Sequence, residues 1–208
     1  MARFHLTEPV ICYQGAQVRA PDGSLLLDHG IPHDLAMEVI EFARDRHLHI
    51  NAYRDDVLLV EHDTVEGREY AHHSGLEPHI VPDLDQAMGP TTPKLVIVAP
   101  KTQIDELLPL VRERWKDRLF VATSLPNYLE MTIPTADKGT ALKFLAERLG
   151  VPQAETIAAG DGRNDLPMLA WAGLAVVVEG APAELLKVAD RIIGPPGTGG
   201  LAKLLDEL

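Results

Sequence analysis

Cysteine is almost absent from the chain, with Cys12 as the single thiol among 208 residues. One thiol cannot form an intrachain disulfide, and this favours the reducing environment of the cytoplasm. No apolar run approaches the roughly 20 residues that span a bilayer, and residues 1–5 lack the apolar core of a signal peptide. These absences predict a cytoplasmic protein without a membrane partner.

Basic residues are also scarce, since 19 Lys and Arg stand against 31 Asp and Glu, for a formal net charge of −12. No basic block interrupts this excess, so nucleic acid is not an expected partner. An acidic chain also repels phosphate at long range. A phosphate site would therefore need a local cation, a metal ion or the amino end of a helix.

The carboxyl-terminal part of the chain has the pattern of a parallel sheet, because helical and strand-like segments alternate after residue 134. Strands joined by single helices form a doubly wound layer, whose ligand site lies at the carboxyl ends of the strands. The expected segments are helix 139–149, strand 156–159, helix 166–172, strand 174–178 and helix 182–189.

The preceding part, from about residue 21 to 133, is typical of a compact mixed α/β unit. Residues 102–105 have the pattern of a capping box, which predicts the start of a helix there. The other expected segments are strands 10–13 and 25–27, a helix from 32 to 47, a hairpin from 48–53 and 57–60, a helix over 63–73, and strands 94–99, 119–122 and 128–133.

The most informative stretch is 157–169, where an apolar strand runs into a glycine-bracketed turn and a helix. Gly160 and Gly162 allow the backbone to turn tightly. Asp161 at the strand end and Asp165 at the helix start can then converge on one cation, and an oxygen-only ligand set favours Mg²⁺. The structural alternative is that Asp161 makes a turn and Asp165 caps a helix.

Lys138 is a second candidate, because it lies at the expected start of a helix. An ammonium group and free backbone amides can meet an anion at such a position. The alternative is an ordinary solvated lysine, which is common near helix ends.

Together these two stretches resemble the last two motifs of the haloacid dehalogenase superfamily, specifically its Cof-type subclass IIB phosphatases. Residues 11–16 also resemble the family strand that leads into an inserted cap. The two motifs are residues 138–142 and 160–169, and the match continues through 172–178, 188–190 and 199–201. The resemblance implies a partial doubly wound, Rossmann-like core at 1–21 and 133–208, with an α/β cap domain at 22–132.

The resemblance also implies roles for individual residues. Asp161 would bind Mg²⁺, and Asp165 would bind the ion or orient it through water. Asn164 would support the loop, and Lys138 would neutralise the phosphate and the nucleophile. Such roles suit phosphoryl transfer, which depends mainly on positioning and charge stabilisation.

The family's nucleophile motif, Asp-x-Asp-Gly-Thr, does not occur in these 208 residues. The nearest acidic pairs lie at 61–63 and 83–85, inside the expected cap, where helix caps and turns explain them. Gln14 and Gly180 stand where the family usually has Asn. We therefore expect a chain that is truncated relative to the family and that is inactive or impaired.

The missing motif also predicts a gap in the core sheet, because the family's first two strands lie between those at 10–13 and 156–159. An exposed central edge readily pairs with another strand. We expect residues 10–13 to close the gap, or another chain to fill it in a homo-oligomer.

The sequence thus predicts a phosphatase of small phosphorylated metabolites, such as sugar phosphates, acting in the complete family through an aspartyl-phosphate. The alternative is a non-catalytic protein that binds a phosphorylated ligand or a partner and has lost the nucleophile. The identity of the substrate depends on the shape of the cap, which the sequence does not give.

Overall fold

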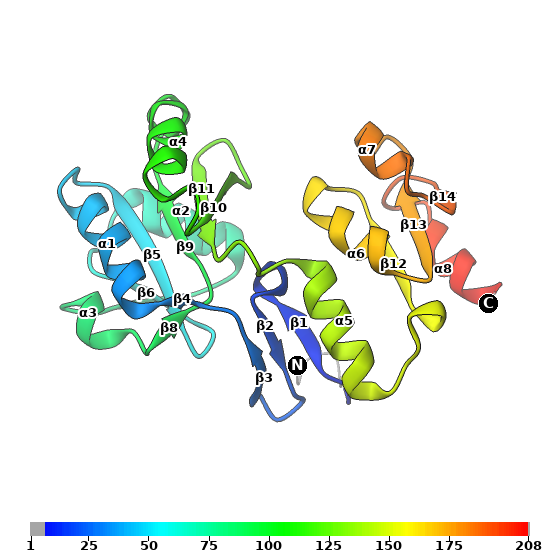
Figure 1. Ribbon diagram of the computed structural model, residues 1–208. Helices are drawn as coiled ribbons and strands as arrows, with labels where there is room; N and C mark the ends of the chain where they lie inside the picture. Colours follow the sequence, from blue (N-terminus) through cyan, green and yellow to red (C-terminus); the bar gives the residue numbers. More distant parts are fainter. Residues whose placement is uncertain (1–6, 208) are drawn as a thin grey trace. The chain divides into compact units, whose positions relative to one another are not determined.

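The computed structural model describes residues 7–207, so the expectation for residues 1–5 lies outside the described part. The chain divides into two compact units, whose elements are labelled in Figure 1. The first unit joins Met1–Leu27 to Thr135–Leu208, and the second is Asp28–Pro134. None of the described helices combines the length and the apolar character that a bilayer crossing requires.

The first unit consists of two small sheets with helices that connect and follow the strands (Figure 1). Its elements are β1 (Val10–Cys12), the 3-10 turn η2 (Tyr13–Gly15), β2 (Gln17–Arg19), β3 (Leu25–Asp28), α5 (Lys138–Leu149), η3 (Gln153–Glu155), β12 (Ile157–Gly160), η4 (Arg163–Asp165), α6 (Leu166–Trp171), β13 (Leu174–Val178), α7 (Ala183–Leu186), β14 (Arg191–Ile193) and α8 (Gly200–Asp206).

The antiparallel sheet of the first unit has the strand order β1-β2-β3. Residues of β1 and β2 pair directly, with Val10 opposite Arg19. Because β3 belongs to this sheet, the first unit extends to Leu27 and not only to residue 21, where the sequence had placed the boundary.

The second sheet of this unit, β12-β13-β14, is parallel, so the predicted α/β architecture is confirmed. The helix expected at 182–189 is shorter, because α7 ends at Leu186. The prediction that β1 lies beside β12 is wrong. β1 turns through η2 into a local hairpin with β2, and β12 is left as an end strand of its own sheet within the described residues.

Small and branched side chains form the core beneath the parallel sheet, where α6 packs on β12 and β13. The buried members of this core are Ala158, Leu169, Ala175, Val177 and Leu185. Helix α5 packs closely on α6. Consequently the amino end of α5 and the loop after β12 are held at the same place in the unit.

The second unit is built around a six-stranded sheet in the order β10-β11-β9-β5-β6-β7. The expected hairpin is confirmed, because β5 and β6 pair antiparallel. The elements are β4 (Ile31–Pro32), α1 (His33–Arg44), β5 (His49–Arg54), β6 (Val57–Val60), α2 (Val65–Ser74), β7 (Pro78–Ile80), α3 (Leu84–Ala87), β8 (Thr91–Thr92), β9 (Leu95–Val98), α4 (Lys101–Trp115), β10 (Phe120–Thr123) and β11 (Tyr128–Thr132).

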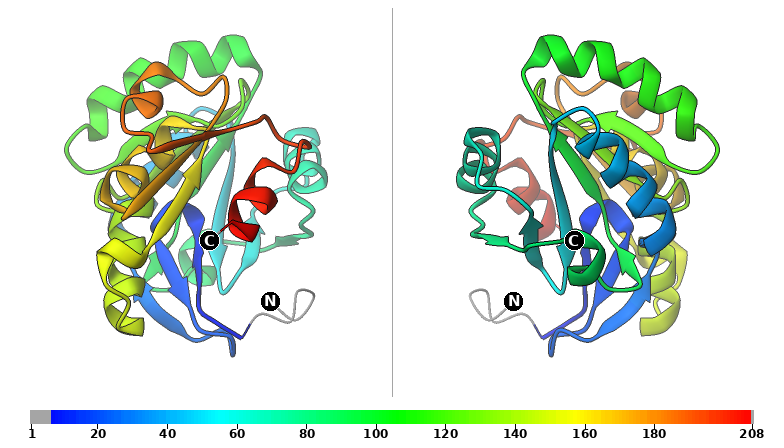
Figure 2. Two further views of the ribbon diagram at one scale, coloured as in Figure 1. Left: turned by 90° about the vertical axis from the view of Figure 1, so that its right-hand side faces the viewer. Right: turned by 90° about the vertical axis from the view of Figure 1, so that its left-hand side faces the viewer.

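Helices cover both faces of this sheet, with α1 and α4 on one face and α2 on the other (Figure 2). Successive strand residues point to opposite faces. Ile50 and Ala52 of β5 accordingly join the main apolar core with α1 and α4, whereas the phenol of Tyr53 faces α2 and hydrogen-bonds that of Tyr70 at 2.5 Å.

Helix α4 begins at Lys101, with Pro100 at the N-cap position and no side-chain cap. The capping box expected at residues 102–105 is therefore wrong. The fixed φ of proline, −53° at Pro100, starts the helix two residues earlier than that pattern indicated. The buried stripe of this helix includes Ile104 and Trp115.

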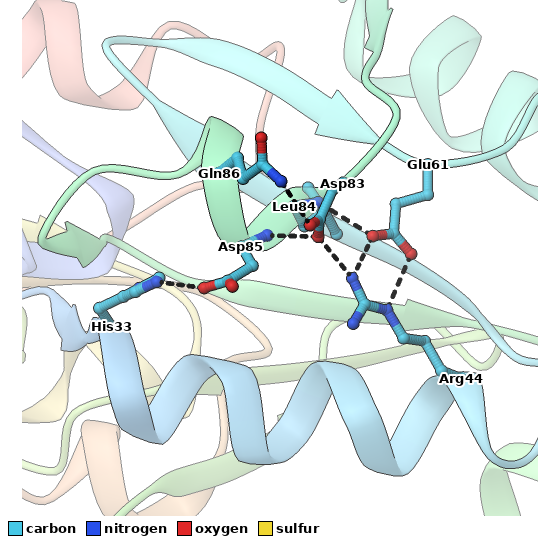
Figure 3. Close-up of polar contacts among 7 residues, drawn as sticks. All are labelled: His33, Arg44, Glu61, Asp83, Leu84, Asp85 and Gln86. Carbon is cyan, nitrogen blue, oxygen red and sulfur yellow. Dashed lines mark hydrogen bonds and ion pairs between the residues drawn. The ribbon is translucent and has the colours of Figure 1, made fainter.

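A polar corner joins three elements of the second unit (Figure 3). Arg44, at the end of α1, donates hydrogen bonds to both carboxylate oxygens of Glu61 and to Asp83 at 3.0 Å. Glu61 also accepts from the backbone amide of Leu84, and Asp83 caps α3 through the amide of Asp85. Asp83 is thus a helix cap, as predicted, whereas Glu61 forms an ion pair that the sequence did not indicate.

Candidate active site

The loop after β12 takes its shape from a close approach between Gly160 and Asp165. A Cβ on Gly160 would lie 2.5 Å from the Cβ of Asp165, so any larger residue would push the two segments apart. Glycine here lets the chain leave the strand and return through η4 within five residues. The backbone turn that the sequence predicted from its glycines has this steric origin.

Asp165 is the centre of the loop, with only 4% of its surface exposed. Its Oδ2 accepts hydrogen bonds from the backbone amides of Asp161 and Gly162, at 3.0 and 2.9 Å. Its Oδ1 accepts from Nζ of Lys138 at 2.5 Å. Burial raises the pKa of Asp165, but the bonds from Lys138 and the two amides outweigh it, so the pKa lies below its ordinary value.

Lys138 reaches this carboxylate from the first residue of α5. Asp137 caps the helix by accepting from the amides of Gly139 and Thr140, at 2.8 and 2.9 Å. The structure therefore brings together Lys138 and Asp165, which are 27 residues apart. An ammonium held at this place can compensate negative charge beside the loop.

Asp161 differs from Asp165 because its side chain is exposed, and its carboxylate has no hydrogen bond or ion pair within residues 7–207. It borders an open hollow of about 310 Å³ whose other lining includes Val178, Ile193 and the glycine-rich loop before α8. Asp161 thus supplies a free carboxylate at the carboxyl end of β12, where ligands of such sheets bind.

This donor set fits Mg²⁺ as a partly hydrated ion. Mg²⁺ commonly keeps several waters and uses one or two protein carboxylates. Asp161 offers the free carboxylate, and the oxygens of Asp165 are already engaged by Lys138 and by two amides. Within the described residues no three His, Cys, Asp or Glu side chains gather in a metal-binding group, so an all-protein cage is not what this loop offers.

Asn164 makes a contact that connects the loop to the beginning of the chain. Its Nδ2 donates to Oε1 of Gln14 at 2.7 Å. Gln14 lies in η2, directly after β1, and was singled out in the sequence only as a departure from the family pattern. Its left-handed backbone, with φ of 61°, is not readable from the sequence. The tertiary structure adds Gln14 to the residues around this loop.

The oxygen-rich loop thus lies at the carboxyl end of a strand of a doubly wound α/β layer, the position at which such sheets bind their ligands. A model of the haloacid dehalogenase-like hydrolases matches residues 1–205. The chain therefore belongs to the haloacid dehalogenase-like hydrolases, and the family expected from the motifs is confirmed.

Individual relatives agree with this assignment. A candidate phosphatase of Haemophilus influenzae is 30% identical over 179 residues, which cover 85% of this chain and 65% of the relative. The chain thus spans just under two thirds of that protein. The HMP-PP phosphatase of Serratia proteamaculans is 28% identical over 192 residues, covering 92% of this chain and 70% of the relative.

A crystal structure of a Thermotoga maritima protein has the same fold. It superposes with a TM-score of 0.88 at 35% identity, and the match covers 96% of this chain and 75% of the other. Both units of this chain are therefore contained in the common fold.

Proposed function

We propose that this chain carries the metal- and phosphate-binding half of a phosphatase site for small phosphorylated metabolites. The observation that supports this most is the pairing of Lys138 with Asp165 beside the free carboxylate of Asp161. The site provides an ammonium and a metal-binding oxygen at adjacent positions in a chain whose net charge is −12. A phosphate ester needs such local compensation to bind here.

In this proposal each residue has a separate role. Asp161 binds Mg²⁺ directly, while Asp165 fixes the loop through two backbone amides and orients Lys138. Asn164 holds the loop against Gln14. When bound, Mg²⁺ would supply charge stabilisation to phosphate oxygens. The geometry favours the indirect role for Asp165, because three of the roughly four lone-pair positions of its carboxylate already accept hydrogen bonds.

The second unit is proposed to be the cap that selects the substrate. Its sheet and helices form an independent apolar core, so it can vary in surface shape without disturbing the loop after β12. The Serratia relative is an HMP-PP phosphatase by name, which supports a small phosphorylated metabolite as the substrate class.

The missing nucleophile motif limits the turnover that this chain can achieve. The 208 residues contain no Asp-x-Asp-Gly-Thr motif, and phosphoryl transfer by the family route needs its aspartate as the attacking group. We expect this 208-residue chain to bind Mg²⁺ and phosphate with little or no hydrolysis of p-nitrophenyl phosphate.

Calorimetry and a turnover assay on the same sample test both statements. Asp161→Ala should abolish Mg²⁺ binding and leave the fold intact, because the carboxylate of Asp161 has no intramolecular partner among the described residues and its backbone amide keeps the bond to Asp165. Asp117→Ala, an exposed aspartate beyond α4 in the second unit, is the matched control. Equal Mg²⁺ affinity in wild type and Asp161→Ala would contradict the proposed site. Robust hydrolysis that Asp161→Ala abolishes would contradict the expected inactivity.

The absent nucleophile motif also supports a second candidate, a non-catalytic protein that binds a phosphorylated ligand. The same experiment separates the two. Micromolar binding of a phosphate ester without turnover, even when a longer form of the chain with the motif is assayed, favours the binding protein. Turnover by that longer form favours the phosphatase.

The end strand β12 supports a proposal about partners. Within the described residues it pairs only with β13, and Ile157 on this strand is 39% exposed. An unpaired strand edge is a template for another chain. We expect a homo-oligomer in size-exclusion chromatography with light scattering, and a monomer at all concentrations would exclude pairing through this edge.

A further inference from the structure

The turn η2 has an unusual backbone. Tyr13 and Gln14 both lie in the left-handed region, with φ of 50° and 61°, and Gly15 follows with φ of 99°. Non-glycine residues seldom adopt this conformation, and where it persists the surrounding structure enforces it, often at functional sites. A turn with ordinary backbone angles would avoid this strain. The surrounding structure must therefore hold Tyr13 and Gln14 in this conformation.

Packing against α5 explains how the turn is held. A Cβ on Gly15 would lie 2.2 Å from the carbonyl oxygen of Asp137 and 2.9 Å from the amide of Lys138. The turn therefore rests directly on the backbone that begins α5, beside the residue that reaches Asp165. The strained turn and the lysine are fixed to each other by this contact.

The side chain of Gln14 is directed to the loop after β12. Its Oε1 accepts from Asn164, as described above, although Gln14 itself is exposed. The carboxamide is planar and carries two further N–H donors on its nitrogen. Those donors have no partner within residues 7–207, so they are available to a ligand at the loop.

Uncharged donors are useful to a bound phosphate here because the cations near the loop are already paired with carboxylates. Lys138 is already paired with Asp165, and Arg163, the other cation of the loop, lies 2.7 Å from Glu184. Both cations of the loop are therefore partly neutralised by carboxylates. A dianionic phosphate at this place would still need hydrogen-bond donors, and a neutral amide provides them without another acid–base pair.

We propose that Gln14 is a ligand-contacting residue of this site: its oxygen is held by Asn164, and its amide nitrogen donates to an oxygen of the bound phosphate group. This inference rests on the proposed function. It assigns Gln14 a contact with phosphate in addition to its contact with Asn164, and the strained turn positions it for both.

The test compares phosphate affinity among variants of the 208-residue chain. Inorganic phosphate is titrated by calorimetry in the presence of saturating Mg²⁺. Asn164→Ala removes only the contact between the two side chains, whereas Gln14→Met removes that contact and the free donor. Gln14→Glu keeps an acceptor for Asn164 but has no donor. Gln103→Met, at an exposed glutamine of α4 in the second unit, is the matched control.

Gln14→Met should bind phosphate about tenfold more weakly than Asn164→Ala, because a hydrogen bond to a charged ligand group is lost. Mg²⁺ affinity, measured alone, should be the same in Gln14→Met and Asn164→Ala. Gln14→Glu retains the contact with Asn164 but replaces the donor by a negative charge, so it should lose more phosphate affinity than Gln14→Met. Unchanged phosphate affinity in Gln14→Glu would overturn the role of Gln14 even if Gln14→Met does not fold.

The experiment distinguishes failure of the Gln14 contact from failure of the proposed function. Phosphate affinity within twofold of wild type in both Gln14→Met and Gln14→Glu overturns the role of Gln14 alone. Absence of phosphate binding by the wild-type chain overturns the proposed function and the inference together. A loss of similar size in Asn164→Ala and Gln14→Met, with none in Gln14→Glu, shows a purely positioning contact and also overturns the inference.

Discussion

Gly139 of α5 lies against the backbone of Pro167 in α6, so closely that a Cβ on Gly139 would be 2.6 Å from the carbonyl carbon and oxygen of Pro167. Backbone atoms cannot move aside as the end of a side chain can. The absence of a side chain at Gly139 therefore sets how near the first turn of α5 comes to the loop of Asp165.

Replacing this glycine should destabilise the first unit. Gly139→Ala gains about 1 kcal/mol in helix propensity at most, but overpacking against a fixed backbone typically costs about 1–3 kcal/mol. We expect a lower urea midpoint in circular dichroism and weaker Mg²⁺ binding. Gly89→Ala is the control, because the nearest atom to its Cβ would be in the Arg54 side chain at 3.6 Å, an ordinary van der Waals distance. Wild-type stability in Gly139→Ala would contradict the steric argument.

The lowered pKa of Asp165 implies that the folding stability of the protein falls at acid pH. Because its pKa is lowered from 3.8 in the folded protein, its contribution to stability is present above pH 3.8 and is lost as the pH falls through the lower folded value. Wild type should therefore lose more stability than Asp165→Asn when acidified from pH 6 to below 3.

The same substitution should lower stability at pH 7. It removes the charge that accepts from Lys138 and weakens the acceptor of two amides, which we estimate at about 1–3 kcal/mol. Urea denaturation at several pH values measures both effects. Asp117→Asn, at an exposed carboxyl group, should match wild type at every pH, and an identical pH profile in Asp165→Asn would refute the assignment.

His49, in the second unit, should make the folding stability depend on pH in a second and higher range. It is 8% exposed, and burial lowers its pKa from 6.5, although a hydrogen bond to Asn51 opposes the shift. As a neutral ring it donates from Nε2 to Asn51 and accepts at Nδ1 from Thr64, both at 2.8 Å. Thr64 in turn caps α2 through Gly67.

Since the folded pKa of His49 is depressed, its contribution to stability is present above about pH 6.5 and is lost as the pH falls through the folded value. Stability of wild type should decline between pH 7 and 5, and His49→Gln should reduce this decline. His79→Gln, at an exposed histidine of β7, should retain it. Hydrogen exchange of α2 amides at the two pH values localises the effect.

Arg44 should stabilise the polar corner of Figure 3 more than an exposed ion pair would. The side chain of Glu61 is 12% exposed. Burial is the largest single influence and raises the pKa of Glu61, but the hydrogen bond and charge of Arg44 together with the amide of Leu84 outweigh it, so the pKa lies below its ordinary value. Arg44→Ala would leave Glu61 and Asp83 without their cation.

We expect Arg44→Ala to lower the unfolding free energy by about 1–3 kcal/mol. Arg68→Ala is the matched control, because Arg68 and Asp63 form an ion pair in which both side chains are 56% exposed. Such surface pairs contribute about 0–1 kcal/mol. Equal losses in the two variants, measured by urea denaturation, would show that the corner is not specially stabilised.

Local patterns in the sequence were sufficient for most elements. The apolar run and glycines at 157–169 predicted β12, the tight turn and α6, and the alternation after residue 134 predicted the parallel sheet, because side-chain periodicity and backbone freedom act over a few neighbouring residues. The start of α4 was missed since Pro100 and a polar pattern at 102–105 gave competing local signals.

The sequence by itself therefore determined the family, most of the elements and the candidate loop with Asp161 and Asp165. Only the tertiary structure decided that Lys138 and Asp165 pair, that Gln14 meets Asn164, and that β1 does not lie beside β12. Those contacts join residues far apart in the chain, and they depend on helix packing and strand partners that no local pattern encodes.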